Sequence, residues 1–352
     1  MRILFHKIFN LKEVTFEEYS NAFKTEEIQN NPENQIYHSE KDTEEHIWNV
    51  VQRVWEFIEI MNPPEYIATA LYMAAFFHDI KKPKTISYDE FGIVHNYDHE
   101  IQAARYLWDY IEDAGIILTP YALDITRLAS RFIQWHMLIK SARLEANPMK
   151  DHLVNSFTME ELPYLVEFAS LDSPGINHKA IHDYIIQRKY QVVGYRPERD
   201  NPKLYLMSGP IASGKSYLAK QLMNEDFNAE IVSTDGIREE LFGHKNTTGK
   251  GSEVFGEAYT RTKELLSFGK KNVIFDATNF NFRLRQNICG IAQQRQIPIV
   301  IYYFVNSLKT CLLQNSKRKD PIPDDVIIKM YNQVEMPSYL EGNEIILKGN
   351  LL

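Results

Sequence analysis

The chain has 352 residues, of which 44% are hydrophobic and 24% are charged, and its formal net charge is −8. This length favours two domains that each bury a core, and the acidic balance excludes a broad basic coat for nucleic acid. Two cysteines, Cys289 and Cys311, leave little room for a disulfide framework and favour a reducing compartment. The N-terminal segment has no long apolar run and no stretch approaches membrane-spanning length, so we expect a cytoplasmic protein without a membrane partner.

The two halves of the chain differ in charge and in histidine content. The first 200 residues carry 20 Lys and Arg against 31 Asp and Glu, whereas the remaining residues carry 19 against 16. Ten of the eleven histidines precede position 200. An acidic, histidine-rich half followed by a mildly basic half suggests one metal site and one nucleotide site in a single polypeptide.

The first half shows the periodicity of helices. Residues 1–35 alternate apolar and charged positions only weakly, and we assign no chemistry to them. A clear helical pattern begins near Asp42, a residue type that favours the N-cap, and Pro63-Pro64 ends it. A second apolar helix is predicted over 66–77, ending at His78-Asp79. The first half is therefore predicted to be a helical domain.

His78 and Asp79 are the most informative pair in this half. Adjacent His and Asp at a helix end can turn toward one point and offer a nitrogen and an oxygen to a divalent metal. A metal held in this way lowers the pKa of water from about 16 toward ~7 and neutralises charge on phosphoryl oxygens. The pair has further polar partners along the chain: His46, Lys82, His99, His136 and Asp172. His38 and His95 lie near these positions in the sequence and are additional candidates.

This order of residues resembles the HD phosphohydrolase superfamily, an all-helical bundle with the pattern H…HD…H…H…D. The resemblance covers roughly residues 36–190. It implies four core ligands for a divalent transition metal, namely His46, His78, Asp79 and Asp172. It also implies that His99 and His136 support a second metal, and that Lys82, three residues after the pair, steadies a phosphate oxygen.

Prolines and charges gather at the join between the halves. Residues 194–202 contain two prolines and four charged residues and interrupt the helical periodicity. We therefore predict an HD-type domain over 1–193, a linker over 194–202 and a second domain over 203–352.

The second domain opens with a complete phosphate-binding motif, Gly209-Pro-Ile-Ala-Ser-Gly-Lys-Ser216. The motif follows the apolar run 204–208, which is typical of a short buried strand, and precedes a helical pattern. The small residues let successive backbone N–H groups and the positive end of the next helix surround a phosphate. Lys215 would reach the terminal phosphates, and the Ser216 hydroxyl would ligate Mg²⁺. ATP or another nucleoside triphosphate is the predicted ligand, and its predicted binding residues are Gly209, Ser213, Gly214, Lys215 and Ser216.

Strand-like runs alternate with helical patterns in the rest of this half, at residues 229–233, 272–275 and 298–305. This alternation predicts an α/β domain with a parallel sheet, helices on both faces and ligands at the carboxyl ends of the strands. The overall prediction is a multidomain chain, with an all-α HD-type helical bundle followed by an α/β P-loop kinase domain.

Polar residues follow the predicted strand ends. After the second strand comes Asp235, which can accept the proton of an attacking hydroxyl, and one helical turn on comes Arg238, which can hold an adjacent phosphate. The motif Asp276-Ala-Thr-Asn279 ends the next strand. Residues 314–323 have the composition of a basic lid stopped by prolines, and its Arg318 could close on the nucleotide phosphates.

These motifs, in this order and spacing, resemble the phage-type 5′-hydroxyl polynucleotide kinase family over about residues 203–337. The resemblance implies that Asp235 is the general base for the 5′-OH and that Arg238 lies on the 3′-phosphate side of the acceptor. It places Thr278 and Asn279 beside the acceptor and makes Arg318 the lid arginine.

Two positions in this half stay open. Gln314 stands where the family often has arginine, so one transition-state contact is either missing or supplied by Lys317 or Lys319. Asp276 belongs either to the acceptor site or, as a strand-end carboxylate, to the Mg²⁺ site.

An HD module ahead of such a kinase resembles the bacterial HD-Pnk family of bifunctional nucleic-acid end-healing enzymes. RNA broken by transesterification ends in a 2′,3′-cyclic phosphate and a 5′-OH, and a ligase can use neither. The resemblance implies that the kinase half makes a 5′-phosphate from ATP, while the HD half opens the cyclic phosphate and removes the resulting monoester. The implied partners are RNA or DNA ends, a nucleic-acid ligase acting downstream and a second copy of the chain in a homodimer.

Two other functions are compatible with the same residues. One is a small-molecule nucleoside-type kinase fused to a nucleotide phosphohydrolase. The other is a regulatory protein whose HD half senses nucleotides. Metal content separates the second alternative from the enzymatic ones, because a sensor needs no metal.

Overall fold

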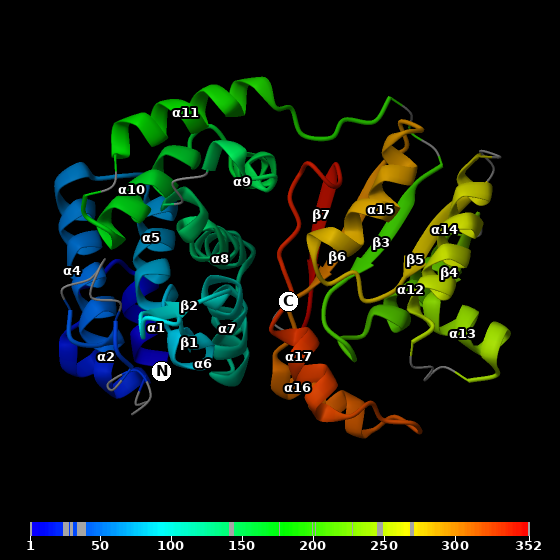
Figure 1. The fold of residues 1–352 in the computed structure, drawn as a ribbon, viewed down its shortest axis with the longest axis horizontal. Coiled ribbons are helices and arrows are strands. Elements are labelled where there is room, and N and C mark those ends of the chain that lie inside the picture. Colours follow the sequence, from blue (N-terminus) through cyan, green and yellow to red (C-terminus); the bar gives the residue numbers. More distant parts are fainter. Residues whose placement is uncertain are drawn as a thin grey trace. The chain divides into compact units, whose positions relative to one another are not determined.

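A computed structural model describes residues 2–23, 28, 31–33, 40–140, 144–175, 177–198, 200, 202–226, 228–244, 249–267 and 271–350 (Figure 1). The candidate His38 lies outside these residues. The chain divides into two compact units, a helical unit that ends at Val192 and an α/β unit over Val193–Asn350. This confirms the predicted order of fold classes. Among the described helices, none is both long enough and apolar enough to cross a membrane.

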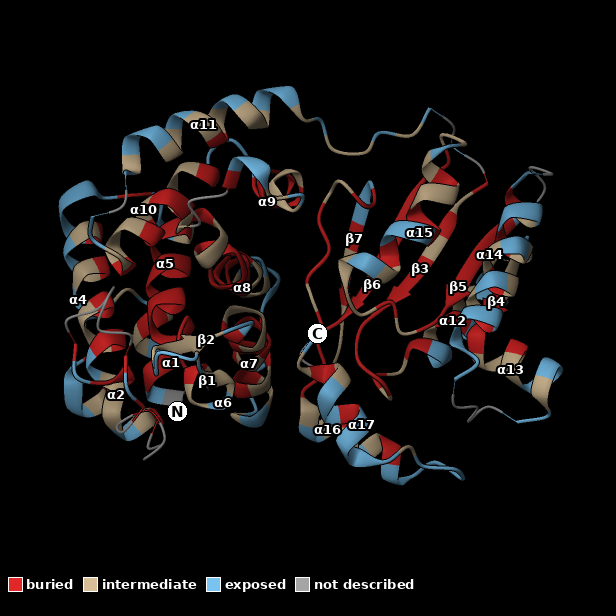
Figure 2. Ribbon diagram, viewed as in Figure 1, coloured by how far each residue is buried: buried red, intermediate tan, exposed pale blue. Residues whose placement is uncertain are grey.

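The helical unit is built around one buried helix. Its elements are α1 (Arg2–Phe9), α2 (Phe16–Phe23), α4 (Thr43–Met61), α5 (Glu65–Phe77), α6 (Lys82–Thr85), α7 (His99–Asp113), α8 (Pro120–Lys140), a 3-10 turn (Leu144–Ala146), α9 (Lys150–Asn155), α10 (Leu162–Asp172) and α11 (His178–Gln191). Helix α5 is apolar on every side, so it is buried almost along its whole length (Figure 2) and packs against α4, α7, α8 and α10. The end of α5 therefore lies deep in the unit, and His78 and Asp79 with it.

Local signals position the helix that carries His46. The Asp42 carboxylate accepts a hydrogen bond from the Glu45 N–H at 3.0 Å, which caps α4 at the predicted residue. At the other end Asn62 adopts a left-handed conformation, φ 44°, and donates its N–H to Ile58. The cap places His46 in the first turn of α4, where its side chain is buried.

Two features of this unit differ from the prediction. The first 35 residues include helices α1 and α2, each only eight residues long, which is too short for a clear periodic pattern. A small antiparallel hairpin, β1 (Ile86–Tyr88) and β2 (Val94–Asn96), interrupts the otherwise helical unit. Its strands have three residues each, so alternation could not reveal them.

The second unit is a parallel sheet with helices in the connections. Its strands are β3 (Leu204–Ser208), β4 (Ala229–Ser233), β5 (Asn272–Asp276), β6 (Ile299–Phe304) and β7 (Glu344–Lys348), in the order β4-β5-β3-β6-β7. Its helices are α12 (Lys215–Glu225), α13 (Thr234–Phe242), α14 (Gly251–Ser267), α15 (Phe282–Gln293), α16 (Leu308–Ser316) and α17 (Asp324–Tyr331). Four strands are confirmed at their predicted positions, whereas β7 was not predicted.

The register of the sheet brings the chemical motifs to one edge. Ser233 pairs with Asp276 across β4 and β5, and all the strands run in the same direction. The phosphate loop after β3, Asp235 after β4 and Asp276 at the end of β5 therefore emerge side by side, as the topology of a parallel α/β sheet requires.

Candidate functional site

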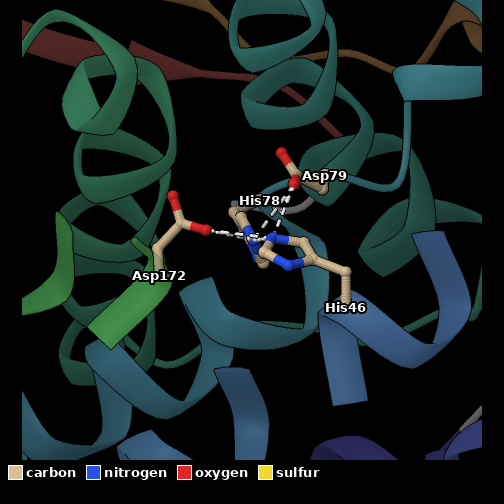
Figure 3. Close-up of side chains that lie close together, drawn as sticks. All are labelled: His46, His78, Asp79 and Asp172. Atoms are coloured by element: carbon tan, nitrogen blue, oxygen red, sulfur yellow. Dashed lines mark hydrogen bonds and ion pairs between the residues drawn. The ribbon is translucent and has the colours of Figure 1, made fainter. Parts of the chain in front are cut away.

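The helical unit brings all six predicted metal ligands into one buried cluster. They come from α4, the end of α5, α7, α8 and α10: His46, His78, Asp79, His99, His136 and Asp172. Figure 3 shows four of them, with the imidazole rings of His46 and His78 between two carboxylates. His46 and Asp172 are 126 positions apart in the chain, yet their side chains are hydrogen-bonded at 3.0 Å in this cluster.

The first group of ligands is His46, His78, Asp79 and Asp172. The His46 Nε2 atom lies 3.1 Å from an Asp79 oxygen, and the His78 Nε2 atom lies 3.3 Å from the same oxygen. One ligand atom from each of the four residues can be chosen so that all lie within 4.8 Å of one another. This spacing is compatible with a single ion bound by two nitrogens and two oxygens.

A second group shares one carboxylate with the first. His99 Nε2 lies 2.9 Å from Asp79 Oδ1, and His136 Nε2 lies 3.8 Å from the same atom. These three residues also satisfy the 4.8 Å spacing. Asp79 thus offers one oxygen to each group, so the cluster has the ligands for two ions bridged by one carboxylate.

Backbone carbonyls orient three of the imidazoles. The Nδ1 atoms of His78, His99 and His136 lie 2.9, 2.5 and 2.7 Å from the carbonyl oxygens of Ala75, Asn96 and Ile133. Because a carbonyl oxygen can only accept, each Nδ1 donates its proton, and in the neutral ring the Nε2 lone pair then faces the cluster. Among the residues that the structure describes, none forms a hydrogen bond with the buried His136 Nε2. This is the arrangement of histidines that bind metal, so the donor set fits a divalent ion.

The carboxylates hold the cluster in a proton-rich state. Burial acts to lower the pKa of His46, but hydrogen bonds to Asp172 and Asp79 outweigh it and raise that pKa to about 10. Burial likewise opposes ionisation of Asp79, yet the positive charges of His78 and Lys82 hold its pKa well below the usual range. A divalent cation would take the place of these protons, because metal binding requires neutral imidazole.

Two lysines complete the charge balance of the cluster. Lys82, the predicted phosphate contact, is buried and lies 2.7 Å from Asp79 and 2.6 Å from Glu33. Lys140 lies 2.5 Å from the outer oxygen of Asp172. Sequence reasoning missed both Lys140 and Glu33. Lys140 could have been found, since it follows His136 by four residues and so shares its face of α8, whereas Glu33 lies in a segment without periodicity.

The phosphate loop of the α/β unit has the backbone that its glycines permit. Gly209 has φ +139°, and a Cβ there would lie 2.8 Å from the Cβ of Phe304. Its N–H donates to the Thr278 carbonyl at 2.9 Å, which ties the loop to the end of β5. Gly214, φ +97°, begins α12. The buried Lys215 ammonium donates to the carbonyls of Gly209, at 3.1 Å, and Pro210, so it caps the loop where phosphates would bind.

A pocket of about 900 Å³ lies above this loop and contains nearly all the predicted kinase residues. Its polar lining includes Ser213, Gly214, Lys215, Ser216, Asp235, Arg238, Asp276, Thr278, Gln314 and Arg318. Its apolar lining includes Phe255, Phe280, Leu284 and Met330. The predicted base and its arginine are paired, with Arg238 Nη1 at 3.0 Å from Asp235 Oδ1, and the Asp235 side chain is half exposed. An acceptor hydroxyl can therefore reach this carboxylate from the pocket.

Asp276 is the second carboxylate of the pocket and lies at its floor. Burial raises its pKa and the Asp235 charge adds to this effect, while a hydrogen bond from the Ser216 hydroxyl opposes it. Burial also lowers the pKa of Lys215 to about 8, against the attraction of Asp276. The contact between Asp276 and Ser216 pairs the two oxygens that would share a Mg²⁺ ion.

Asn279 lies apart from the other predicted site residues. Its side chain is fully buried and donates to the Met207 carbonyl at 2.8 Å, and the Ser208 hydroxyl donates to the Asn279 carbonyl at 2.8 Å. It is not among the residues that line the pocket. Asn279 thus joins the turn after β5 to β3, and its predicted contact with the acceptor stays a prediction.

The lid segment between α16 and α17 is held as a turn by one buried side chain. Asn315 donates to the Ile322 carbonyl at 2.7 Å and accepts from the Ile322 N–H at 3.0 Å. Arg318 lies in the turn so formed, exposed to solvent and at the rim of the pocket.

Comparisons with known proteins concern the second unit. A family model described as an AAA domain matches residues 204–337, which is less than half of the chain. A curated relative, tRNA dimethylallyltransferase 1 from Pelobacter propionicus (strain DSM 2379 / NBRC 103807 / OttBd1), is 31% identical over 100 residues, covering 28% of this chain and 31% of its own length. The chain thus spans about a third of the curated relative that it matches.

Two solved structures are similar at low identity. One, entitled "Structure of the Pnkp1/Rnl/Hen1 RNA repair complex", is 22% identical with a TM-score of 0.35, covering 40% of this chain and 50% of its own. The other, a gluconokinase from Sinorhizobium meliloti 1021, is 13% identical with a TM-score of 0.32, covering 42% and 83%. With TM-scores this low, neither structure carries an argument about substrate.

The fold, the complete phosphate loop and the family match define the second unit as a P-loop kinase domain. This class implies ATP with Mg²⁺ as the phosphoryl donor. The first unit is a helical domain whose buried His and Asp side chains could hold a metal ion.

Proposed function

We propose that the chain is a bifunctional nucleic-acid end-healing enzyme of the HD-Pnk kind, with a domain boundary in residues 194–202. The α/β unit phosphorylates the 5′-OH of an RNA end with ATP. The helical unit removes the 2′,3′-cyclic phosphate from a 3′ end. The observation that carries the proposal is the presence of two chemically distinct groups of residues in one chain. One is a buried His/Asp cluster with the spacing of metal ligands, and the other is a phosphate loop whose pocket contains a carboxylate–arginine pair.

In the helical unit, His46, His78, Asp79 and Asp172 would hold one divalent ion, and His99 and His136 with Asp79 would hold a second. Such ions act as Lewis acids toward phosphoryl oxygens and lower the pKa of water. Lys82 and Lys140 flank the cluster, each beside a different carboxylate, and supply positive charge to a bound phosphate. Opening the cyclic ester consumes one water, and hydrolysis of the monoester consumes a second and releases inorganic phosphate.

In the α/β unit, Lys215 leaves the loop carbonyls and binds the terminal phosphates of ATP, and Ser216 with Asp276 would hold Mg²⁺. Asp235 accepts the proton of the 5′-OH as its oxygen attacks the γ-phosphorus, and ADP leaves. Arg238, which lies 3.0 Å from Asp235, faces the acceptor phosphate, with Thr278 beside it. Arg318 closes from the lid turn over the transferred group. A positively charged lid compensates for a transition state in which negative charge is spread over the phosphoryl oxygens.

One substrate tests both activities. An RNA with a 5′-OH and a 2′,3′-cyclic phosphate is incubated with ATP and a panel of divalent metals, and each end is followed separately. Asp235→Ala should reduce 5′ phosphorylation by about 100- to 10,000-fold, the range for loss of a general base, and leave the 3′ reaction intact. Asp79→Ala should do the reverse. Asp124→Ala, at an exposed position of α8, is the matched control.

The alternatives give different results in the same experiment. Loss of both activities in either variant would contradict two independent sites. Phosphorylation of free nucleosides or sugar acids, with none of the oligonucleotide, would assign the kinase to small molecules. Purified protein without bound metal, and without metal-dependent hydrolysis, would leave the helical unit a sensor rather than an enzyme. A cytoplasmic location and a ligase downstream are part of the same proposal.

A further inference from the structure

The hairpin β1–β2 carries an exposed pair of stacked aromatic rings next to the metal cluster. The His95 and Tyr97 rings are nearly parallel, with 5.5 Å between centroids and 8° between planes. Tyr97 is 69% exposed although it is a large aromatic residue. The His95 ring thus lies in an offset stack against Tyr97, and most of the Tyr97 surface is open to solvent.

Hydrogen bonds hold this pair in place. Asp89 accepts from the N–H groups of Phe91 and Ile93 at 2.9 and 2.8 Å, which fixes the turn of the hairpin. The other oxygen of Asp89 lies 3.2 Å from His95 Nε2. The contact with Asp89 therefore anchors the edge of the His95 ring, and the stack is formed before any ligand arrives.

The stack is joined directly to the metal cluster. Asn96, between the two rings in the sequence, accepts a hydrogen bond from His99 Nδ1 at 2.5 Å, and His99 Nε2 lies 2.9 Å from Asp79. One residue, Asp98, lies between Tyr97 and His99, so the Cα atoms of Tyr97 and His99 are at most about 7 Å apart. A nucleotide whose terminal phosphate lies at the cluster has its base within reach of the Tyr97 ring.

We propose that the open face of Tyr97 binds the 3′-terminal nucleobase of a polynucleotide by stacking, with His95 as the ring beneath it. This inference rests on the proposed function and specifies how its 3′ substrate is held. An aromatic face accepts any of the four bases, because each base has a π-face, so the site recognises a strand end without reading its sequence. The cluster then takes the phosphate, and the stack sets which phosphate of the chain reaches it.

The test measures base stacking without any reaction. A 5′-phosphorylated RNA that ends in a 2′,3′-diol carries 2-aminopurine at its last nucleotide, and its fluorescence is titrated with the full-length chain in the presence of Mn²⁺. This end cannot be turned over. The wild type should quench the terminal 2-aminopurine and leave a 2-aminopurine ten nucleotides inward unchanged. Tyr97→Ala should remove the quenching and weaken binding by about 5- to 150-fold, the range for loss of one stacking ring.

Two further variants isolate the role of the ring. Tyr97→Phe keeps the ring and should behave as the wild type, whereas Tyr97→Leu keeps apolar volume without a π-face and should behave as Tyr97→Ala. Tyr190→Ala removes an aromatic residue that is 75% exposed on α11 and should have no effect. Tyr97 is exposed, so these variants are expected to fold, which tryptophan emission confirms.

The outcomes separate this inference from the proposed function. Quenching that depends on Tyr97, together with no hydrolysis of cyclic-phosphate ends, would support the stack and refute the proposed reaction. Hydrolysis of those ends with the same affinity and quenching in Tyr97→Ala would overturn the stack and leave the reaction in place. A change in sedimentation of Tyr97→Ala without a change in quenching would assign this surface to a second copy of the chain and overturn the inference.

Discussion

Gly209→Ala is expected to destabilise the α/β unit strongly. The residue has φ +139°, a conformation that side chains other than glycine rarely adopt, which costs about 1–3 kcal/mol. Its new Cβ would lie 2.8 Å from the Cβ of Phe304 and 3.1 Å from the Phe304 carbonyl oxygen, and such overpacking costs a further ~1–3 kcal/mol. Because Phe304 lies in a central strand, neither atom can move away cheaply. We expect a loss of about 2–6 kcal/mol in the free energy of unfolding.

The assay uses the distribution of tryptophan. All four tryptophans precede residue 193, so their emission follows the helical unit, while far-UV circular dichroism follows both units. In urea, the unfolding transition of the α/β unit is the one seen by dichroism but not by tryptophan emission. Gly209→Ala should move this transition to a lower urea concentration. The control is Gly256→Ala on α14, where a Cβ meets nothing within 4 Å, and it should stabilise that unit by ~0.5–1 kcal/mol. A Gly209→Ala protein within ~0.5 kcal/mol of the wild type, with unchanged ATP affinity, would refute the steric argument.

Three further predictions concern buried charge and metal. Burial lowers the pKa of Lys215 to about 8, so the unfolded chain binds more protons than the folded chain up to about pH 10.5. The free energy of unfolding of the wild type, relative to that of Lys215→Met, should therefore rise by about 2 kcal/mol from pH 7 to 9.5. A difference in dichroism melts that stays constant with pH would contradict this. Arg285→Met should cost about 3–5 kcal/mol because it strands the buried carboxylate of Glu341, and the double variant with Glu341→Gln should recover part of the loss, which urea unfolding measures. A divalent metal at 100 times its dissociation constant should raise the melting temperature of the tryptophan-monitored transition by about 5–10 °C. A chelator should reverse this shift, and Asp172→Asn should abolish it. Equal shifts in the wild type and the variant would place the ion elsewhere.

Local signals in the sequence accounted for much of the fold. Asp42 predicts the start of α4, because its side chain caps the helix through a hydrogen bond to a residue only three positions away. Strands of the parallel sheet such as β3 and β5 are apolar runs, so they can be predicted from the local sequence alone. The edge strand β7 escaped prediction because it lies beyond the alternating strands and helices and carries charges at both ends, Glu344 and Lys348. The hairpin before His99 escaped because three residues are too few to establish a period.

The candidate sites also differ in how far the local sequence could predict them. A contiguous motif such as residues 209–216 can be read locally, because its chemistry comes from successive backbone groups. The ion pair between Lys82 and Glu33 depends on a contact across 49 positions, which only the folded chain defines. Asn279 shows a different limit, because a polar residue at a strand end can stabilise the sheet as well as bind a ligand. Its hydrogen bond to the Met207 carbonyl depends on a contact across 72 positions, which the sequence does not reveal.

Asp79 gives one oxygen to each group of histidines, and this economy has a consequence for how the cluster can vary. With an ion in each group, a substitution of Asp79 would alter the binding of both ions at once. Selectivity for different ions would then come from the residues that the groups do not share: His46, His78 and Asp172 in one group, and His99 and His136 in the other.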